Sequence, residues 1–110
     1  MTELRVYSIA PGRRRDFDKR FTEVARPLFA EYGFRLGEVW DSLESPETFV
    51  YTLRWRSAEE RDEAWGRFAE DARWQTARKA SEEPIPLVLK IDRFLLNASC
   101  VSPRGTRKGD

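Results

Sequence analysis

The order in which strand-like and helix-like hydrophobic patterns follow one another most constrains the fold of this 110-residue chain. Apolar residues at every second position indicate a strand, whereas apolar steps of three and four indicate one face of a helix. Strands are expected over residues 3–9, 34–40, 48–56 and 87–96, and helical segments begin near residues 13 and 57. The order β-α-β-β-α-β is that of the ferredoxin-like arrangement, which predicts an α+β fold with an antiparallel four-stranded sheet and the helices on one face.

The two helical segments have recognisable starts and ends. In the first, an apolar stripe leads to Gly33, a typical C-terminal cap, and Pro27 predicts a kink before that end. The stripe consists of Phe17, Phe21, Val24, Leu28 and Tyr32. The second segment opens with a capping box over residues 57–60. Its inward face is expected to carry Trp65, Phe68 and Ala72, and Asp71 is expected to start a further short helix.

Two of the expected strands are apolar on both of their faces. Residues 48–56 and 87–96 lack the clean alternation of apolar and polar residues that a half-solvated sheet shows. Helices on one face would therefore leave a second apolar face without a cover. A second copy of the chain is the simplest cover, so the sequence predicts a homodimer.

Composition excludes several classes of function. The chain has no histidine and a single cysteine, Cys100, which removes the usual zinc, non-haem iron and Ser-His or Cys-His sites, so no metal and no cofactor is expected. A balance of 20 basic against 19 acidic residues argues against a nucleic-acid partner. No apolar run approaches the roughly 20 residues that span a bilayer, so no membrane partner is expected. The lone cysteine favours a cytoplasmic setting.

Residues 1–96 should form one domain, followed by a disordered polar and basic tail over residues 97–110.

Five short motifs, in order and at similar spacing, make the chain resemble the NIPSNAP family. They are residues 3–7 (ELRVY) with 11–13 (PGR), residues 32–34 (YGF) leading to Trp40, residues 55–61 (WRSAEER) and residues 71–75 (DARWQ). The resemblance covers about residues 2–96. It implies a dimeric α+β barrel, in which two ferredoxin-like chains pack sheet against sheet. That group includes cofactor-independent monooxygenases, cyclases and isomerases, haem-degrading enzymes and proteins without a known reaction.

The first strand supplies the candidate catalytic residues. Arg5 and Tyr7 share one face of this strand, where Arg5 would stabilise negative charge on a ligand oxygen and Tyr7 would donate a hydrogen bond to it. Glu38, or alternatively Asp41, would accept a proton. The structural alternative is an ion pair of Arg5 with Glu38 or Asp92, beside a tyrosine packed at the dimer interface.

Aromatic residues supply the candidate ligand contacts. The candidates are Trp40, Tyr51, Trp55, Trp74 and Arg93. Packing in the core or the interface is the expected role of most of the aromatic residues, and Trp40 and Trp74 are preferred as ligand contacts because they lie near the ends of elements. We therefore expect a homodimer that binds a small hydrophobic, aromatic or polyketide-like molecule. It would transform that molecule without a cofactor, by oxygenation, cyclisation or isomerisation. The alternative is a non-catalytic interaction or scaffold protein that uses the same dimer.

Overall fold

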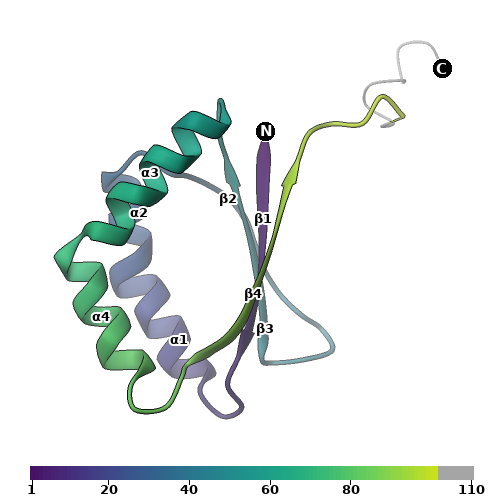
Figure 1. Cartoon of the computed structure of the whole chain (residues 1–110). Coiled ribbons are helices and arrows are strands. Elements are labelled where there is room, and N and C mark those ends of the chain that lie inside the picture. Colours follow the sequence, from purple (N-terminus) through teal and green to yellow (C-terminus); the bar gives the residue numbers. More distant parts are fainter. Residues whose placement is uncertain (102–110) are drawn as a thin grey trace.

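Helices cover one face of a four-stranded antiparallel sheet in the computed structural model, which describes residues 1–101 (Figure 1). The elements are β1 (Thr2–Ile9), α1 (Arg14–Arg20), η1 (Phe21–Ala25), α2 (Arg26–Glu31), β2 (Arg35–Asp41), β3 (Thr48–Arg54), α3 (Ala58–Glu70), α4 (Ala72–Glu82) and β4 (Val88–Leu96). The strand order β2-β3-β1-β4 places β1 in the centre and β2 and β4 at the edges. The predicted ferredoxin-like α+β architecture is confirmed.

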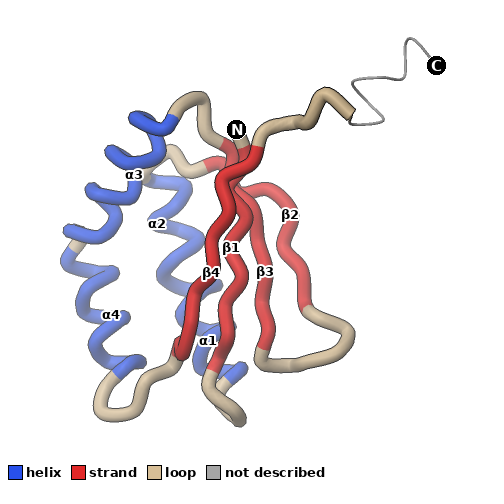
Figure 2. Tube along the Cα trace, turned by 45° about the vertical axis from the view of Figure 1, so that its right-hand side comes forward, coloured by secondary structure: helices blue, strands red, loops and turns tan. Residues whose placement is uncertain are grey.

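The register of the sheet assigns each strand residue to one of the two faces. Cross-strand partners share a face, and Tyr7 is opposite Phe49 on β3 and Ile91 on β4. That face is turned toward the helices, as the rotated view in Figure 2 shows for the sheet as a whole. Val6, which is opposite Val50 on β3, belongs to the other face, called here the open face.

The first helical segment accommodates Pro27 through a turn of π-helix, η1. The N–H of Arg26 donates to the carbonyl of Phe21, five residues earlier, and Pro27 follows immediately at the start of α2. A proline lacks an N–H and crowds the preceding turn, and a widened turn is a common response to such a disturbance. The segment ends at Gly33, whose φ of +80° lies in the left-handed region that glycine adopts freely.

Both helices of the second helical segment, α3 and α4, begin with a side-chain cap. The Ser57 hydroxyl accepts a hydrogen bond from the Glu60 N–H at 3.0 Å, which confirms the predicted cap of α3. The Asp71 carboxylate caps α4 by accepting from the Arg73 N–H at 2.8 Å. The expected inward position of Ala72 is wrong: this residue is exposed. The break at Asp71 restarts the helical phase, and α4 consequently has no fully buried residue.

The hydrophobic core fills the layer between the helices and the sheet, and aromatic rings dominate it. Phe29 and Phe34 stack with ring centroids 4.6 Å apart, and Phe34 also contacts the rings of Trp55 and Trp65 at 5.0 and 4.8 Å. No helix within residues 1–101 combines the length and apolar character needed to cross a bilayer. Residues 97–101 form neither helix nor strand, and most of the predicted tail, 102–110, lies outside the described residues.

Candidate functional site

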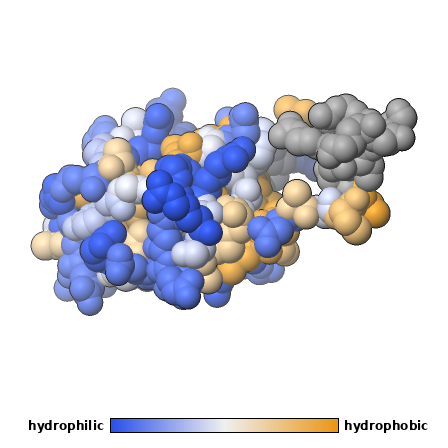
Figure 3. Space-filling view, turned by 90° about the horizontal axis from the view of Figure 1, so that it is seen from above, coloured by the Kyte–Doolittle hydropathy of each residue, from blue (hydrophilic) through white to orange (hydrophobic). Residues whose placement is uncertain are grey.

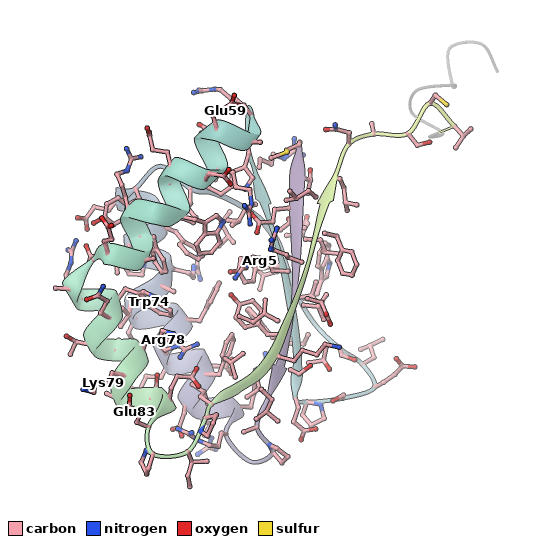
Figure 4. All side chains as sticks on the ribbon, viewed as in Figure 1. Arg5, Glu59, Trp74, Arg78, Lys79 and Glu83 are labelled. Atoms are coloured by element: carbon pink, nitrogen blue, oxygen red, sulfur yellow. The ribbon has the colours of Figure 1, made fainter. Side chains whose placement is uncertain are left out.

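A cavity of about 450 Å³ lies between the helices and the sheet. Its walls come from β1, β3 and β4 on one side and from the helices on the other. Aromatic residues are the largest group in the lining: Tyr7, Phe17, Phe21, Phe29, Tyr51, Trp65, Phe68 and Trp74. Figure 4 shows Arg5 extending from β1 toward the helices, with Trp74 and Arg78 on the side of α4 that faces the sheet. Such an apolar enclosure with few polar groups is typical of small-molecule sites.

Three polar side chains form the inner end of the cavity. The Arg5 guanidinium donates from Nε to the Tyr51 hydroxyl at 3.1 Å and from Nη2 to the Tyr7 hydroxyl at 3.1 Å. The two hydroxyl oxygens are 3.0 Å apart. One phenol donates its proton to the other, so one of the two O–H groups has no acceptor within residues 1–101. Both tyrosines line the cavity, and Tyr7 is 8% exposed against 1% for Tyr51, so this end of the cavity has a phenol O–H to donate.

A fully buried carboxylate, Glu3, fixes the Arg5 side chain from behind. Its two oxygens accept from Arg5 Nη1 at 2.9 Å, from Arg61 Nε at 2.9 Å and from Arg61 Nη2 at 3.1 Å. The indole N–H groups of Trp55 and Trp65 add hydrogen bonds at 2.9 and 3.1 Å. The Arg5 guanidinium also lies over the Trp65 ring, 4.3 Å from its centroid. A rigid, charged group is thereby held at the end of an apolar cavity.

Burial and hydrogen bonds among Glu3, Arg5 and Tyr51 fix the charge of each side chain. Burial alone would raise the pKa of Glu3, but hydrogen bonds from Arg61, Trp65 and Arg5 outweigh it and lower the pKa to about 2. Burial alone would lower the pKa of Arg5, yet its phenol neighbours and Glu3 raise that pKa further above its ordinary value. Burial, followed by the charge of a neighbouring Tyr7, raises the pKa of Tyr51 well above the usual value for a phenol. Glu3 and Arg5 therefore stay charged and Tyr51 neutral across the physiological range.

Comparison with known proteins identifies the family. The family model described as NIPSNAP matches residues 2–103. The chain belongs to the NIPSNAP family. Among curated proteins, none is similar enough in sequence to match this chain.

Solved structures support the same fold. A NIPSNAP family protein from Agrobacterium tumefaciens is 23% identical and superposes with a TM-score of 0.79, covering 93% of this chain and 95% of its own. A NIPSNAP domain protein from Burkholderia xenovorans is 20% identical, with a TM-score of 0.75 and coverage of 93% and 97%. A candidate antibiotic biosynthesis monooxygenase from Nitrosomonas europaea is 15% identical, with a TM-score of 0.63 and coverage of 89% and 98%. At these identities the likeness concerns the fold alone.

The NIPSNAP fold brings four of the candidate residues to the cavity. Arg5, Tyr7, Tyr51 and Trp74 all line it. Trp55 is buried and lies behind the cavity, where its indole holds Glu3.

The other three candidates lie elsewhere on the molecule. Glu38 is exposed on the edge strand β2, and Trp40, on the same strand, is 45% exposed on the open face. Arg93 is exposed on β4, opposite Arg5 in the ladder, without reaching the cavity wall. The alternative proton acceptor, Asp41, forms an ion pair with Arg14 at the surface.

Sequence reasoning missed Glu3 and named the wrong partner for Arg5. The expected ion pair with Glu38 or Asp92 is wrong, because the carboxylate that binds Arg5 is two residues away on the same strand. Side chains two apart on a strand share a face, so the alternation of β1 already placed Glu3 beside Arg5. Glu3 and Arg5 lie on the strand face that packs against the core, and two opposite charges on such a face indicate a buried ion pair.

Proposed function

We propose that this NIPSNAP domain binds a small hydrophobic, aromatic or polyketide-like molecule that carries a phenol or enol oxygen. The observation that supports the proposal is the polar end of the cavity, where Arg5 and the paired Tyr7 and Tyr51 hydroxyls meet among aromatic walls. The volume of about 450 Å³ is large enough for a molecule of two or three fused rings.

The polar end favours an oxygen that bears negative charge. A guanidinium and a spare phenol O–H are both donors, and Glu3 holds the guanidinium in place before any ligand arrives. Donors that are fixed in advance stabilise developing charge without reorganising. The site should therefore lower the pKa of the bound phenol or enol and hold its anion.

This stabilisation is the contribution that a cofactor-independent reaction of an enolate requires. Oxygenation by O₂, cyclisation and isomerisation all begin from such an anion. Glu82 is the one carboxylate in the described cavity wall, and it already accepts hydrogen bonds from Arg20 and from the Leu87 and Val88 N–H groups. In this proposal the domain therefore supplies charge stabilisation and positioning, and water accepts the proton, in place of Glu38.

We also propose that the working form is a cytoplasmic homodimer joined through the open face. Support comes from the apolar side chains exposed on that face, among them Trp40 at 45%, Phe94 at 49% and Leu96 at 46%. Figure 3, seen from above, shows hydrophilic residues over the helical side and hydrophobic ones gathered toward the sheet. Monomeric proteins rarely leave such a patch in water.

The test of binding compares 2-naphthol with naphthalene, which lacks the oxygen. Equilibrium dialysis should show that the wild-type protein binds 2-naphthol about tenfold more tightly, the size expected for a hydrogen bond to a charged group. Tyr7→Phe should remove most of this difference. Tyr32→Phe is the matched control, because the Tyr32 hydroxyl donates to Asp71 at 2.6 Å, away from the cavity.

A second measurement addresses charge stabilisation directly. The absorption spectrum of bound 2-naphthol should show ionisation at a pH about one unit lower than that of the free compound. Equal binding of the two compounds, or an unshifted ionisation, would contradict the proposal. A failure of both compounds to bind would favour the scaffold alternative.

A further inference from the structure

The charged residues around the cavity are not balanced, and the imbalance points to a second polar group on the ligand. The lining includes Arg5, Arg20, Arg78 and Lys90 against the single carboxylate of Glu82. A cation without a carboxylate partner in the chain attracts a ligand carboxylate more strongly than a cation that already has one. The four cations differ in their partners.

Arg5 and Arg20 are both neutralised by buried or half-buried carboxylates. Arg5 pairs with Glu3 at 2.9 Å, and Arg20 pairs with Glu82 at 2.9 Å. Arg20 is also only 8% exposed and lies over the Trp74 ring, 5.0 Å from its centroid. Its role in the wall is structural, since its guanidinium ties α1 to the end of α4.

Lys90 places its charge on the other side of the sheet. In the ladder it is opposite Ser8, one residue out of phase with Tyr7 and Ile91, so its side chain belongs to the open face. There its ammonium lies 3.4 Å from the Asp92 carboxylate. Lys90 therefore contributes to the cavity wall without its ammonium group facing the cavity.

Arg78 is the remaining cation, and among residues 1–101 its guanidinium has neither an ion pair nor a hydrogen bond. It lies on α4 between Trp74 and Glu82, four residues from each, on the stripe that lines the cavity. The carboxylate one turn away, Glu82, is occupied by Arg20 and by backbone N–H groups. Figure 4 shows Arg78 on the inner side of α4, whereas Lys79 lies on its outer side.

We propose that Arg78 binds a carboxylate of the ligand at the open side of the cavity. This inference rests on the proposed function, because it concerns the same ligand in the same cavity. Arg5 is 11% exposed, whereas Arg78 is an exposed residue at the cavity's solvent side. The ligand is then an aromatic acid with two separated polar ends: a phenol or enol oxygen at Arg5 and Tyr7, and a carboxylate at Arg78. The apolar wall between them contacts its rings.

The experiment uses 6-hydroxy-2-naphthoic acid, which has its hydroxyl and carboxylate at opposite ends of two fused rings, and its uncharged methyl ester. Equilibrium dialysis at neutral pH should give binding of the acid about fivefold or more tighter than binding of the ester, the effect expected for an exposed charge-assisted contact. Arg78→Gln should abolish this preference and leave binding of the ester unchanged. Lys79→Gln removes the same charge from the adjacent, outward-facing position and should keep the preference.

The possible failures separate the two proposals. If the wild-type protein binds acid and ester equally, or if Arg78→Gln and Lys79→Gln weaken acid binding equally, the carboxylate site is disproved while the proposed function stands. If neither acid, ester nor 2-naphthol binds to the wild-type protein, the proposed function fails and this inference fails with it. Thermal unfolding of both variants should match the wild type, since both side chains are exposed.

Discussion

Each face of the sheet holds some side chains that are unusual for its surroundings. The face under the helices holds the buried ion pair of Glu3 with Arg5, together with the hydroxyls of Tyr7 and Tyr51. The open face holds apolar side chains such as Phe94, which is 49% exposed. Charged side chains are usually exposed and large apolar ones buried. Both sets are therefore exceptions, within a covered face that is otherwise apolar and an open face that also holds the Lys90–Asp92 ion pair.

The two exceptions agree with the two proposed interactions, which are a ligand in the cavity and a second copy of the chain on the open face. No buried side-chain nitrogen or oxygen within residues 1–101 lacks a hydrogen-bond partner, so the charged network on the covered face is satisfied apart from the spare phenol O–H. Such a network supports a site for a polar group of a ligand. The open face exposes apolar side chains beside the Lys90–Asp92 ion pair, and an exposed apolar patch near polar residues is typical of an interface with another protein.

The largest expected effect follows from removing the centre of the covered network. Glu3→Ala leaves Arg5 and Arg61 buried or half-buried without their shared carboxylate, and it should lower the free energy of unfolding by about 3–5 kcal/mol. Urea unfolding measures the change. Glu59→Ala is the control, because Glu59 is exposed on α3 (Figure 4) and should change stability by less than about 0.5 kcal/mol. Similar stabilities of the two variants would show that the network contributes little.

The second prediction concerns the pH dependence of the same network. Glu3 has a pKa lowered from 4.5 to about 2 in the folded chain, so it stabilises the fold above the unfolded pKa and this contribution is lost as pH falls toward 2. Unfolding experiments on wild type and Glu3→Gln should therefore show a difference that shrinks by up to about 3 kcal/mol between pH 5 and pH 2. A difference that stays constant over this range would contradict the assignment.

The third and smallest effect is expected on the open face. Phe94→Asp should weaken dimerisation at least about thirtyfold, because it places a charge in an apolar contact. The monomer should keep its fold, since Phe94 is half-exposed in the single chain. Sedimentation measures the dimer and circular dichroism the fold. A wild-type chain that is monomeric at micromolar concentration would disprove the proposed interface.

Particular residues show how far the candidate site was predictable. Arg5, Tyr7 and Trp74 were identified because a charge, a phenol and an indole occur in patterned segments. Trp40 was grouped with Trp74 because both lie near the ends of elements, yet only Trp74 lines the cavity. Trp40 lies on the open face because the helices pack on the other face of the sheet. The alternation of a strand shows which residues share a face, but it does not show which face the helices cover.

The sequence by itself determined the element order, the turn at Gly33, the caps at Ser57 and Asp71, and the family. These features depend on local chemistry: hydrophobic period, backbone freedom and side-chain hydrogen bonds to nearby N–H groups. The alternation of β1 placed Glu3 beside Arg5. Only the tertiary structure decided that Arg61 also binds Glu3, and that Arg78 faces the cavity without a carboxylate. Such contacts join residues far apart in the chain, so they are set by how the layers pack and not by any local pattern.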